Sequence, residues 1–230
     1  MARFRFITDY TIPSSLRYRF RSIRFSWFKA LMIDGRNMVN ILDVGGTVEY
    51  WRTMYSDRPP TMKISLLNLY PQQANSSDFL WLEGDATNMS NVKNGEFDII
   101  FSNSVIEHVG TFGDQKRMAD EIIRIGKSYF IQTPNRYFPI EPHFLFPFYN
   151  LLPMFIKVVL LTNFSLGYMP KAKNKQEAIN IINSVRLLNE KELRILFPNA
   201  KLKKERFLGI TKSLIVYGEN GPRSPNLNNF

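Results

Sequence analysis

The sequence predicts an α/β protein, a three-layer sandwich in which helices cover both faces of a mostly parallel seven-stranded sheet. Three observations predict this fold. An apolar segment at 40–44 runs directly into a pair of glycines. Strand-like and helix-like segments then alternate through most of the chain. Two strands joined through a glycine, at 202–207 and 213–217, end the pattern and indicate an antiparallel hairpin.

The bulk composition fits one globular domain, which we expect at 1–218 with a disordered tail at 219–230. The 230 residues include no cysteine, which excludes disulfides, thiolate catalysis and cysteine-bound zinc. The net charge of +10 suits an anionic substrate, an anionic membrane surface or nucleic acid, and equally a basic surface that aids solubility.

No targeting or membrane-spanning segment is visible. The first residues alternate basic and aromatic side chains and build no apolar signal region. The most apolar stretch, 144–161, is interrupted by Pro147, Pro153 and Lys157, whereas a membrane span needs about 20 mostly apolar residues. We therefore expect a cytoplasmic protein.

Residues 14–32 have the pattern of an amphipathic helix. The apolar side chains at spacings of three and four are Leu16, Phe20, Ile23, Trp27 and Leu31. The arginines at 17, 21 and 24 fall largely outside this stripe. We expect the stripe to pack on the domain as a cap, with peripheral contact to an anionic membrane as the alternative.

The first two strands carry the clearest ligand signals. Strand 40–44 ends at Asp43 and Val44, and Gly45 and Gly46 then allow a tight turn before a helix that starts near Val48. A second strand at 63–69 contains Asn68. In a dinucleotide-type unit an acid about 20 residues past the glycines binds the ribose hydroxyls, and the Asn68 oxygen can also accept a hydrogen bond.

Later strands end in polar side chains as well. The strand that starts at Phe79 runs into Gly84, Asp85 and Ala86. The strand at 97–101 ends in a polar exit that contains Ser102 and Asn103. A short helix at 105–109, a helix at 114–125 and a strand at 128–133 follow. Because ligands bind at the carboxyl ends of parallel strands, we expect these tips to meet at one edge of the sheet.

The segment 135–175 differs from the rest of the chain. It combines several prolines with many aromatic residues, so it cannot be regular sheet. We expect an insertion folded over the ligand edge, where a substrate would lie, with a plain packing loop as the alternative. A helix at 176–188 follows it.

The glycine pair lacks the G-x-G-x-x-G spacing of NAD enzymes and the lysine of a phosphate-binding loop. From Asn40 to Gly218 the order of motifs instead resembles the class I S-adenosylmethionine-dependent methyltransferases, closest to the small-molecule branch with the ubiquinone and menaquinone biosynthesis enzymes. The motifs include residues 42–47, 84–86 and 97–109. The resemblance implies a Rossmann-like fold, S-adenosylmethionine as cofactor and a small-molecule acceptor. Lipid-linked and sugar-like molecules are the two candidate types of acceptor.

The resemblance also implies a role for each matching residue. The glycines would wrap the methionine part of the cofactor, Asp43 would arrange the loop or its ammonium group, and Asn68 would meet the ribose. The adenine would be bordered by Asp85 and Ala86, and the floor near the sulfonium lined by Ser102 and Asn103. The chain departs from the family pattern twice, because its loop has fewer glycines and the ribose acid is an amide.

Methyl transfer requires alignment of the nucleophile, the methyl group and sulfur, and a hydroxyl acceptor also needs a base. We expect His143 in the insertion to be that base, with Glu141 as the orienting carboxylate. A histidine bonded to backbone is the alternative. His108 follows Glu107 in the chain, and we expect a structural role for it; we predict no metal site.

Two other function classes stay open on the sequence. The short glycine loop and Asn68 would also fit a binding protein built on a catalytically decayed methyltransferase fold. The net charge would fit a nucleic-acid modifier, but the aromatic insertion suggests an apolar pocket and no RNA-binding module is visible. We therefore expect a small-molecule substrate and no nucleic acid.

Overall fold

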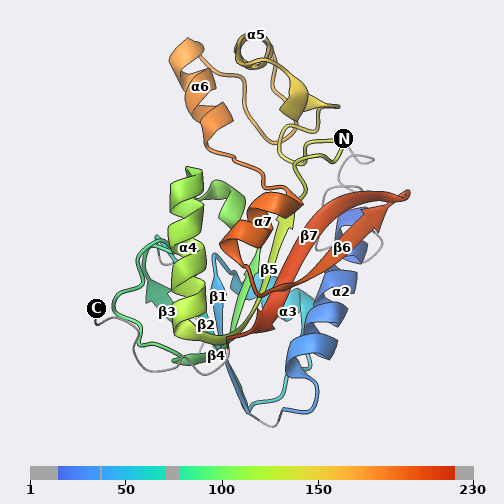
Figure 1. The fold of residues 1–230 in the computed structure, drawn as a ribbon. Helices are drawn as coiled ribbons and strands as arrows, with labels where there is room; N and C mark the ends of the chain where they lie inside the picture. The colour runs from blue at the N-terminus through green and yellow to red at the C-terminus, as the bar shows by residue number, and fades with distance from the viewer. Residues whose placement is uncertain (1–14, 37, 71–77, 221–230) are drawn as a thin grey trace.

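The computed structural model of the protein describes residues 15–36, 38–70 and 78–220. A seven-stranded sheet with the order β3-β2-β1-β4-β5-β7-β6 forms its centre (Figure 1). The first five strands are parallel, and β7 runs antiparallel to both β5 and β6. This confirms the predicted fold class. The strands are β1 Val39–Val44, β2 Met62–Asn68, β3 Leu80–Glu83, β4 Phe97–Asn103, β5 Gly126–Pro134, β6 Lys201–Phe207 and β7 Ile210–Glu219.

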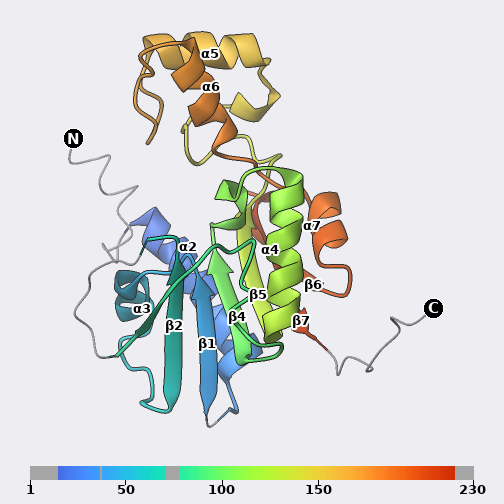
Figure 2. The ribbon, with the colours of Figure 1, turned by 90° about the vertical axis from the view of Figure 1, so that its left-hand side faces the viewer.

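Helices cover both faces of the sheet (Figure 2). On one face α4 (Phe112–Ile125) and α7 (Glu190–Leu196) pack over an aliphatic cluster that includes Leu42, Ile100 and Ile122. On the other face α2 (Leu16–Phe28), a π-helical turn at Lys29–Ile33 and α3 (Val48–Met54) close an aromatic core. A 3-10 turn at Ile106–His108 follows β4. Both layers leave the carboxyl ends of the strands uncovered.

The N-terminal helix buries a different face from the predicted one. Leu16, Ile23 and Leu31 are 39%, 45% and 42% exposed, whereas the side chains buried along α2 are Arg24, Phe25 and Phe28. Phe20 and Trp27 of the predicted stripe are half-buried and pack on the domain, but its other three residues are exposed and Arg24 is buried, so the predicted stripe was wrong in part. The reason is that Arg24 forms a buried ion pair, described below, which lets a charged residue occupy a core-facing position.

The predicted insertion forms a small helical unit beyond the carboxyl ends of the strands (Figures 1 and 2). It contains a 3-10 turn at Tyr149–Leu151, α5 (Met154–Asn163) and α6 (Lys175–Asn183). It has its own hydrophobic cluster, which includes Phe144, Leu161, Ala178 and Ile182. Since α6 supplies part of this cluster, the unit continues past residue 175, and the helix predicted at 176–188 ends at Asn183.

The C-terminal hairpin is confirmed. Leu208 and Gly209 form its turn, both with positive φ (49° and 82°), as a tight two-residue hairpin requires. Strand β7 reaches Glu219, and the Asn220 side chain donates hydrogen bonds to the carbonyls of Ile123 and Gly126. Residues 219 and 220 are thus not part of the predicted disordered tail, and residues 221–230 lie outside the described part. None of the described helices has the length and apolar character that a membrane span requires.

Candidate functional site

A cavity of about 460 Å³ opens at the carboxyl ends of β1, β2 and β3. Four of the predicted cofactor residues line it, namely Gly45, Asn68, Asp85 and Ala86. The loops after three strands therefore meet at one edge of the sheet. The other lining residues are Val44, Leu67, Leu69, Tyr70, Gly84, Val105, His108 and Val109.

Gly45 is required at its position for two reasons. Its φ is +76°, and a Cβ built there would lie only 2.5 Å from Cγ2 of Val105. Its backbone N–H donates a 2.8 Å hydrogen bond to the carbonyl of Leu67, which ties the turn to β2. The glycine therefore lets the main chain border the cavity without a side chain filling it.

Asp43 lies beneath the glycine turn. Its Oδ2 accepts a 2.7 Å hydrogen bond from Nε1 of Trp51, and a Cβ at Gly46 would lie 2.0 Å from that oxygen. The side chain is 2% exposed, and burial raises its pKa to about 8 despite the bond from Trp51. Of the two roles predicted for Asp43, these contacts match the arrangement of the glycine loop.

Asn68 is joined to the same turn. Its Nδ2 donates a 3.0 Å hydrogen bond to the carbonyl of Gly46, and its own carbonyl accepts from the backbone N–H of Gly84. In the next loop, Asp85 Oδ1 accepts from the backbone N–H and the hydroxyl of Thr87, which forms a compact turn. Hydrogen bonds thus connect the three loops that line the cavity.

Ser102 and Asn103 lie at the end of β4 but do not line the cavity. The Ser102 hydroxyl is fully buried and donates to the carbonyl of Val44 at 3.1 Å. Asn103 Oδ1 accepts a 2.8 Å hydrogen bond from Arg24, whose Nε lies 3.2 Å from Oε1 of the buried Glu205. In these contacts the two residues connect β4 to β1 and α2.

Two histidines meet at the rim of this cavity. Nε2 of His143 lies 3.1 Å from Nε2 of His108, and the rings are perpendicular at 89°. On its other side His143 bonds through Nδ1 to Oε1 of Glu141 at 2.7 Å. Glu141 is 1% exposed and is held by the backbone N–H groups of His143 and Phe144. The predicted base and its orienting carboxylate are therefore in contact, and His108 connects them to the cavity.

His108 is the residue whose position differs most from expectation. The sequence analysis favoured a structural role, but the side chain lines the cavity. Burial, and next the neighbouring His143, hold the pKa of His108 below its usual range. These surroundings favour the neutral form of the ring. His108 follows a strand that ends at the ligand edge, and this position in the sequence could have indicated that its side chain lines the cavity.

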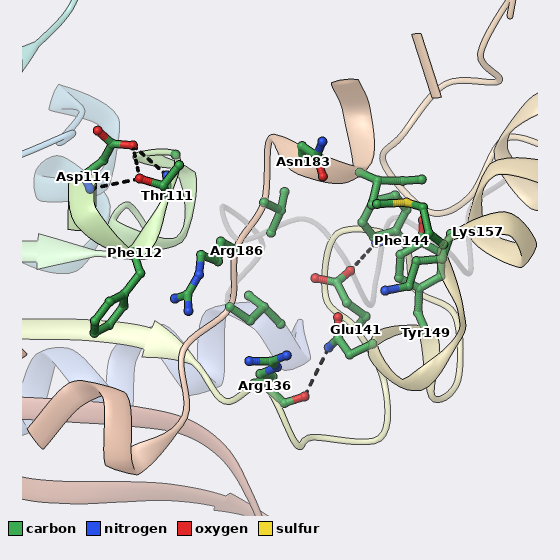
Figure 3. Close-up of a pocket in the computed structure, with 16 residues that line it drawn as sticks. Thr111, Phe112, Asp114, Arg136, Glu141, Phe144, Tyr149, Lys157, Asn183 and Arg186 are labelled. Carbon is green, nitrogen blue, oxygen red and sulfur yellow. Dashed lines mark hydrogen bonds between the residues drawn. The ribbon is translucent and has the colours of Figure 1, made fainter. Parts of the chain in front are cut away.

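A second cavity of about 610 Å³ lies between the core sheet and the helical unit (Figure 3). Glu141 lines it, so the chain of contacts through His143 joins the two cavities. Its basic side chains are Arg136, Lys157 and Arg186, and aromatic rings from Phe112 and Tyr149 face the same space. The sequence analysis did not single out these cations.

The three cations have different partners. Arg186 bonds to Gln115 Oε1 at 2.7 Å and to Glu192 Oε1 at 2.5 Å, and Arg136 lies 3.7 Å from the same Glu192 oxygen. Lys157 packs over the ring of Tyr149, 5.3 Å from its centroid. Burial, with a contribution from Arg136, lowers the pKa of Lys157. The cavity therefore gathers three cations, of which Glu192 pairs with two, and its own lining also includes the acids Asp114 and Glu141.

Comparisons with known proteins agree with this geometry. A family model described as a methyltransferase domain matches residues 42–129, which hold the glycine turn, Asp85 and strands β2, β3 and β4. Over 51 residues the chain is 41% identical to the uncharacterized protein Rv1509 of Mycobacterium tuberculosis (strain H37Rv). That match covers 22% of this chain and 17% of the relative, so the relative's activity does not transfer.

Solved structures share the fold at low sequence identity. The CurJ carbon methyltransferase aligns with a TM-score of 0.57 at 7% identity over 89% of this chain and 55% of its own. The N-methyltransferase NodS of Bradyrhizobium japonicum, solved with S-adenosyl-L-homocysteine, gives 0.52 at 10% identity over 88% of each chain. The N-terminal domain of EvdMO1, also with this product bound, gives 0.51 at 13% identity over 86% and 80%.

The fold is therefore the Rossmann-like fold of S-adenosylmethionine-dependent methyltransferases, and residues 42–129 carry the sequence signature of a methyltransferase domain. Together they indicate S-adenosylmethionine as the cofactor, as predicted. The roles of the individual site residues stay predictions.

Proposed function

We propose that the protein is an S-adenosylmethionine-dependent methyltransferase that methylates an oxygen of a small anionic acceptor. The observation that carries this proposal is that the contacts Glu141–His143–His108 connect a second cavity, which Glu141 lines, to the cavity bordered by the glycine turn, which His108 lines. One cavity can hold a cofactor and the other an acceptor, with titratable groups between them.

The first cavity suits the cofactor by its position and size. Its volume of about 460 Å³ falls within the range of small-ligand sites. The main chain at Gly45 is open to a ligand, and Asn68 has an amide oxygen that can accept from a ribose hydroxyl. Asp85 and Ala86 are placed to border the base. These assignments follow the family resemblance residue by residue.

The second cavity suits an acceptor with a negative group. The basic residues offer donors to a carboxylate or phosphate, and Arg186 and Lys157 are positioned by packing over the rings of Phe112 and Tyr149. Of its acids, Glu141 is bonded to His143, and Asp114 is bonded to Thr111 and paired with Arg117. A sugar acid or an acidic phenol fits this lining better than a neutral lipid. The ubiquinone and menaquinone branch stays a prediction.

The chemistry needs little from the protein beyond position and a proton acceptor. The acceptor oxygen attacks the methyl carbon, the carbon–sulfur bond breaks, and sulfur keeps the electron pair. The hydroxyl proton leaves toward the histidine pair, which Glu141 orients through Nδ1 of His143. The products are the methylated acceptor, S-adenosylhomocysteine and a proton.

The test is a turnover assay that measures S-adenosylhomocysteine release across matched acceptors with and without a carboxylate or phosphate group. Release that depends on an anionic hydroxylated acceptor supports the proposal. Calorimetry with S-adenosylmethionine provides the second measurement. Cofactor binding without release, over the full acceptor set, would favour the decayed binding protein instead.

A further inference from the structure

The two histidines at the rim of the cofactor cavity face each other through the same ring atom. Their Nε2 atoms are 3.1 Å apart. Nδ1 of His143 is bonded to Oε1 of Glu141 at 2.7 Å, and His108 has a hydrogen bond with the backbone of Ser184. In the tautomers that donate Nδ1–H to Glu141 and to the backbone of Ser184, the two facing nitrogens each present a lone pair. Two lone pairs at this distance repel unless a positive species lies between them.

A third group at the same place lacks a partner. Glu107 is fully buried, and its Oε2 accepts a 2.9 Å hydrogen bond from the hydroxyl of Thr133. Its Oε1 has no hydrogen-bond partner within the described part of the chain. Ligand atoms of Glu107, His108 and His143 all lie within 4.8 Å of one another. A proton shared by the rings would not neutralise the buried carboxylate, whereas a cation held by all three residues would balance its charge and occupy both histidine lone pairs.

The spacing fits a metal ion. Two nitrogens bound tetrahedrally to zinc at about 2.0–2.1 Å are about 3.3 Å apart, close to the observed 3.1 Å. Metal-binding histidines almost always donate their other N–H to a carboxylate or a backbone carbonyl, as Glu141 and Ser184 allow here. Two imidazoles and one carboxylate form a ligand set that suits zinc and related divalent ions.

We propose that Glu107, His108 and His143 bind a divalent transition-metal ion of the zinc class and leave one coordination position open toward the cavities. The binding stands on this geometry alone. Its role rests on the proposed function and changes one step of it: a bound ion would occupy the two histidine nitrogens and would lower the pKa of the acceptor hydroxyl, so that the proton leaves to water and not to the histidine pair. The oxygen then forms its bond to the methyl carbon as the carbon–sulfur bond breaks.

The test measures metal binding without cofactor or acceptor. Protein stripped with a chelator is titrated with Zn²⁺ by calorimetry, and with Co²⁺ to observe the absorption band of a four-coordinate site. We expect a single ion per chain. His108→Ala, which removes a half-exposed ring, and Glu107→Gln should each weaken Zn²⁺ binding at least about ten-fold. Asp120→Asn, an exposed carboxylate on α4, is the matched control and should bind like the wild type.

Several outcomes would overturn the metal site. The first is a folded wild-type protein that binds neither ion, and the second is equal Zn²⁺ affinity in His108→Ala and wild type. The third is protein that does not bind Zn²⁺ and shows an NMR signal of a proton shared between the two rings. Circular dichroism verifies that each variant is folded. If His108→Ala does not fold, Zn²⁺ binding by Glu107→Gln tests the proposal. Since S-adenosylmethionine binding is measured separately, loss of the metal site and failure of the proposed function are distinguishable.

Discussion

Nδ2 of Asn68 donates a 3.0 Å hydrogen bond to the carbonyl of Gly46. This contact links the two departures from the family pattern, the short glycine loop and the amide in place of the ribose acid. A carboxylate at 68 could not donate, and it would face the Gly46 carbonyl with a second acceptor. In this chain the amide therefore holds the loop in the position that opens the cavity.

Asn68→Asp should accordingly weaken S-adenosylmethionine binding, even though it restores the residue type that the family uses. We expect about a ten-fold rise in Kd, equivalent to about 1.4 kcal/mol, because the loop loses a hydrogen bond and gains a repulsion. Calorimetry measures the affinity. Asn180→Asp on α6 controls for the added charge, and tighter cofactor binding by the Asn68 variant would contradict this account.

Gly45→Ala tests whether the glycine turn requires glycine, and the same substitution at Gly95 is the matched control. Both Gly45 and Gly95 have positive φ, but only at Gly45 would the new Cβ collide with a neighbour, Val105. Gly95→Ala should lower the free energy of unfolding by about 1–2 kcal/mol from backbone strain alone. Gly45→Ala should lower it by roughly 2–4 kcal/mol and abolish cofactor binding. Urea denaturation and calorimetry report both quantities, and equal losses in the two variants would mean that the contact with Val105 is unimportant.

Lys157→Met tests the assignment of the second cavity. Loss of the cation should raise the KM for an anionic acceptor about ten-fold while the Kd for S-adenosylmethionine stays unchanged. Lys171→Met removes an exposed lysine from the same helical unit and serves as the control. Steady-state kinetics on charged and uncharged acceptors make the comparison. A similar KM change for both acceptors would show that Lys157 does not recognise the negative group.

The raised pKa of Asp43 predicts that the stability contributed by this group falls as the pH rises. Burial raises its pKa from 3.8 to about 8 in the folded protein. The group therefore contributes most stability below pH 3.8, and that contribution is lost as pH rises to about 8, where the folded carboxyl must ionise. Asp43→Asn cannot ionise, and its oxygen can still accept from Trp51.

The free energy of unfolding of Asp43→Asn relative to wild type should therefore increase between pH 5 and pH 9, by about 4 kcal/mol for a folded pKa of about 8. Urea denaturation at several pH values measures the difference, which removes the contribution of all other groups. A difference that is flat across this range would mean that Asp43 keeps an ordinary pKa.

Local patterns were sufficient to predict the order of the elements and the edge where the ligand loops meet. Alternating apolar residues, the turn at Gly45 and the hairpin turn at Gly209 are short-range signals, and parallel strands align their ends by topology. The same patterns misidentified the buried face of α2. An apolar stripe through Leu16 and Ile23 and another through Phe25 and Phe28 share one period. Tertiary contacts distinguish them, because Phe25 and Phe28 pack in the aromatic core and the adjacent Arg24 pairs with the buried Glu205.

The sequence by itself thus determined the fold class and the positions of Gly45, Asn68 and Asp85 at one sheet edge. Only the tertiary structure decided which groups stand opposite them. His108 and His143 are 35 residues apart, and their contact depends on how the helical unit packs over the strands. Such a contact leaves no periodic trace in the chain, because it arises from the packing of two separate elements and not from the repeat of either one.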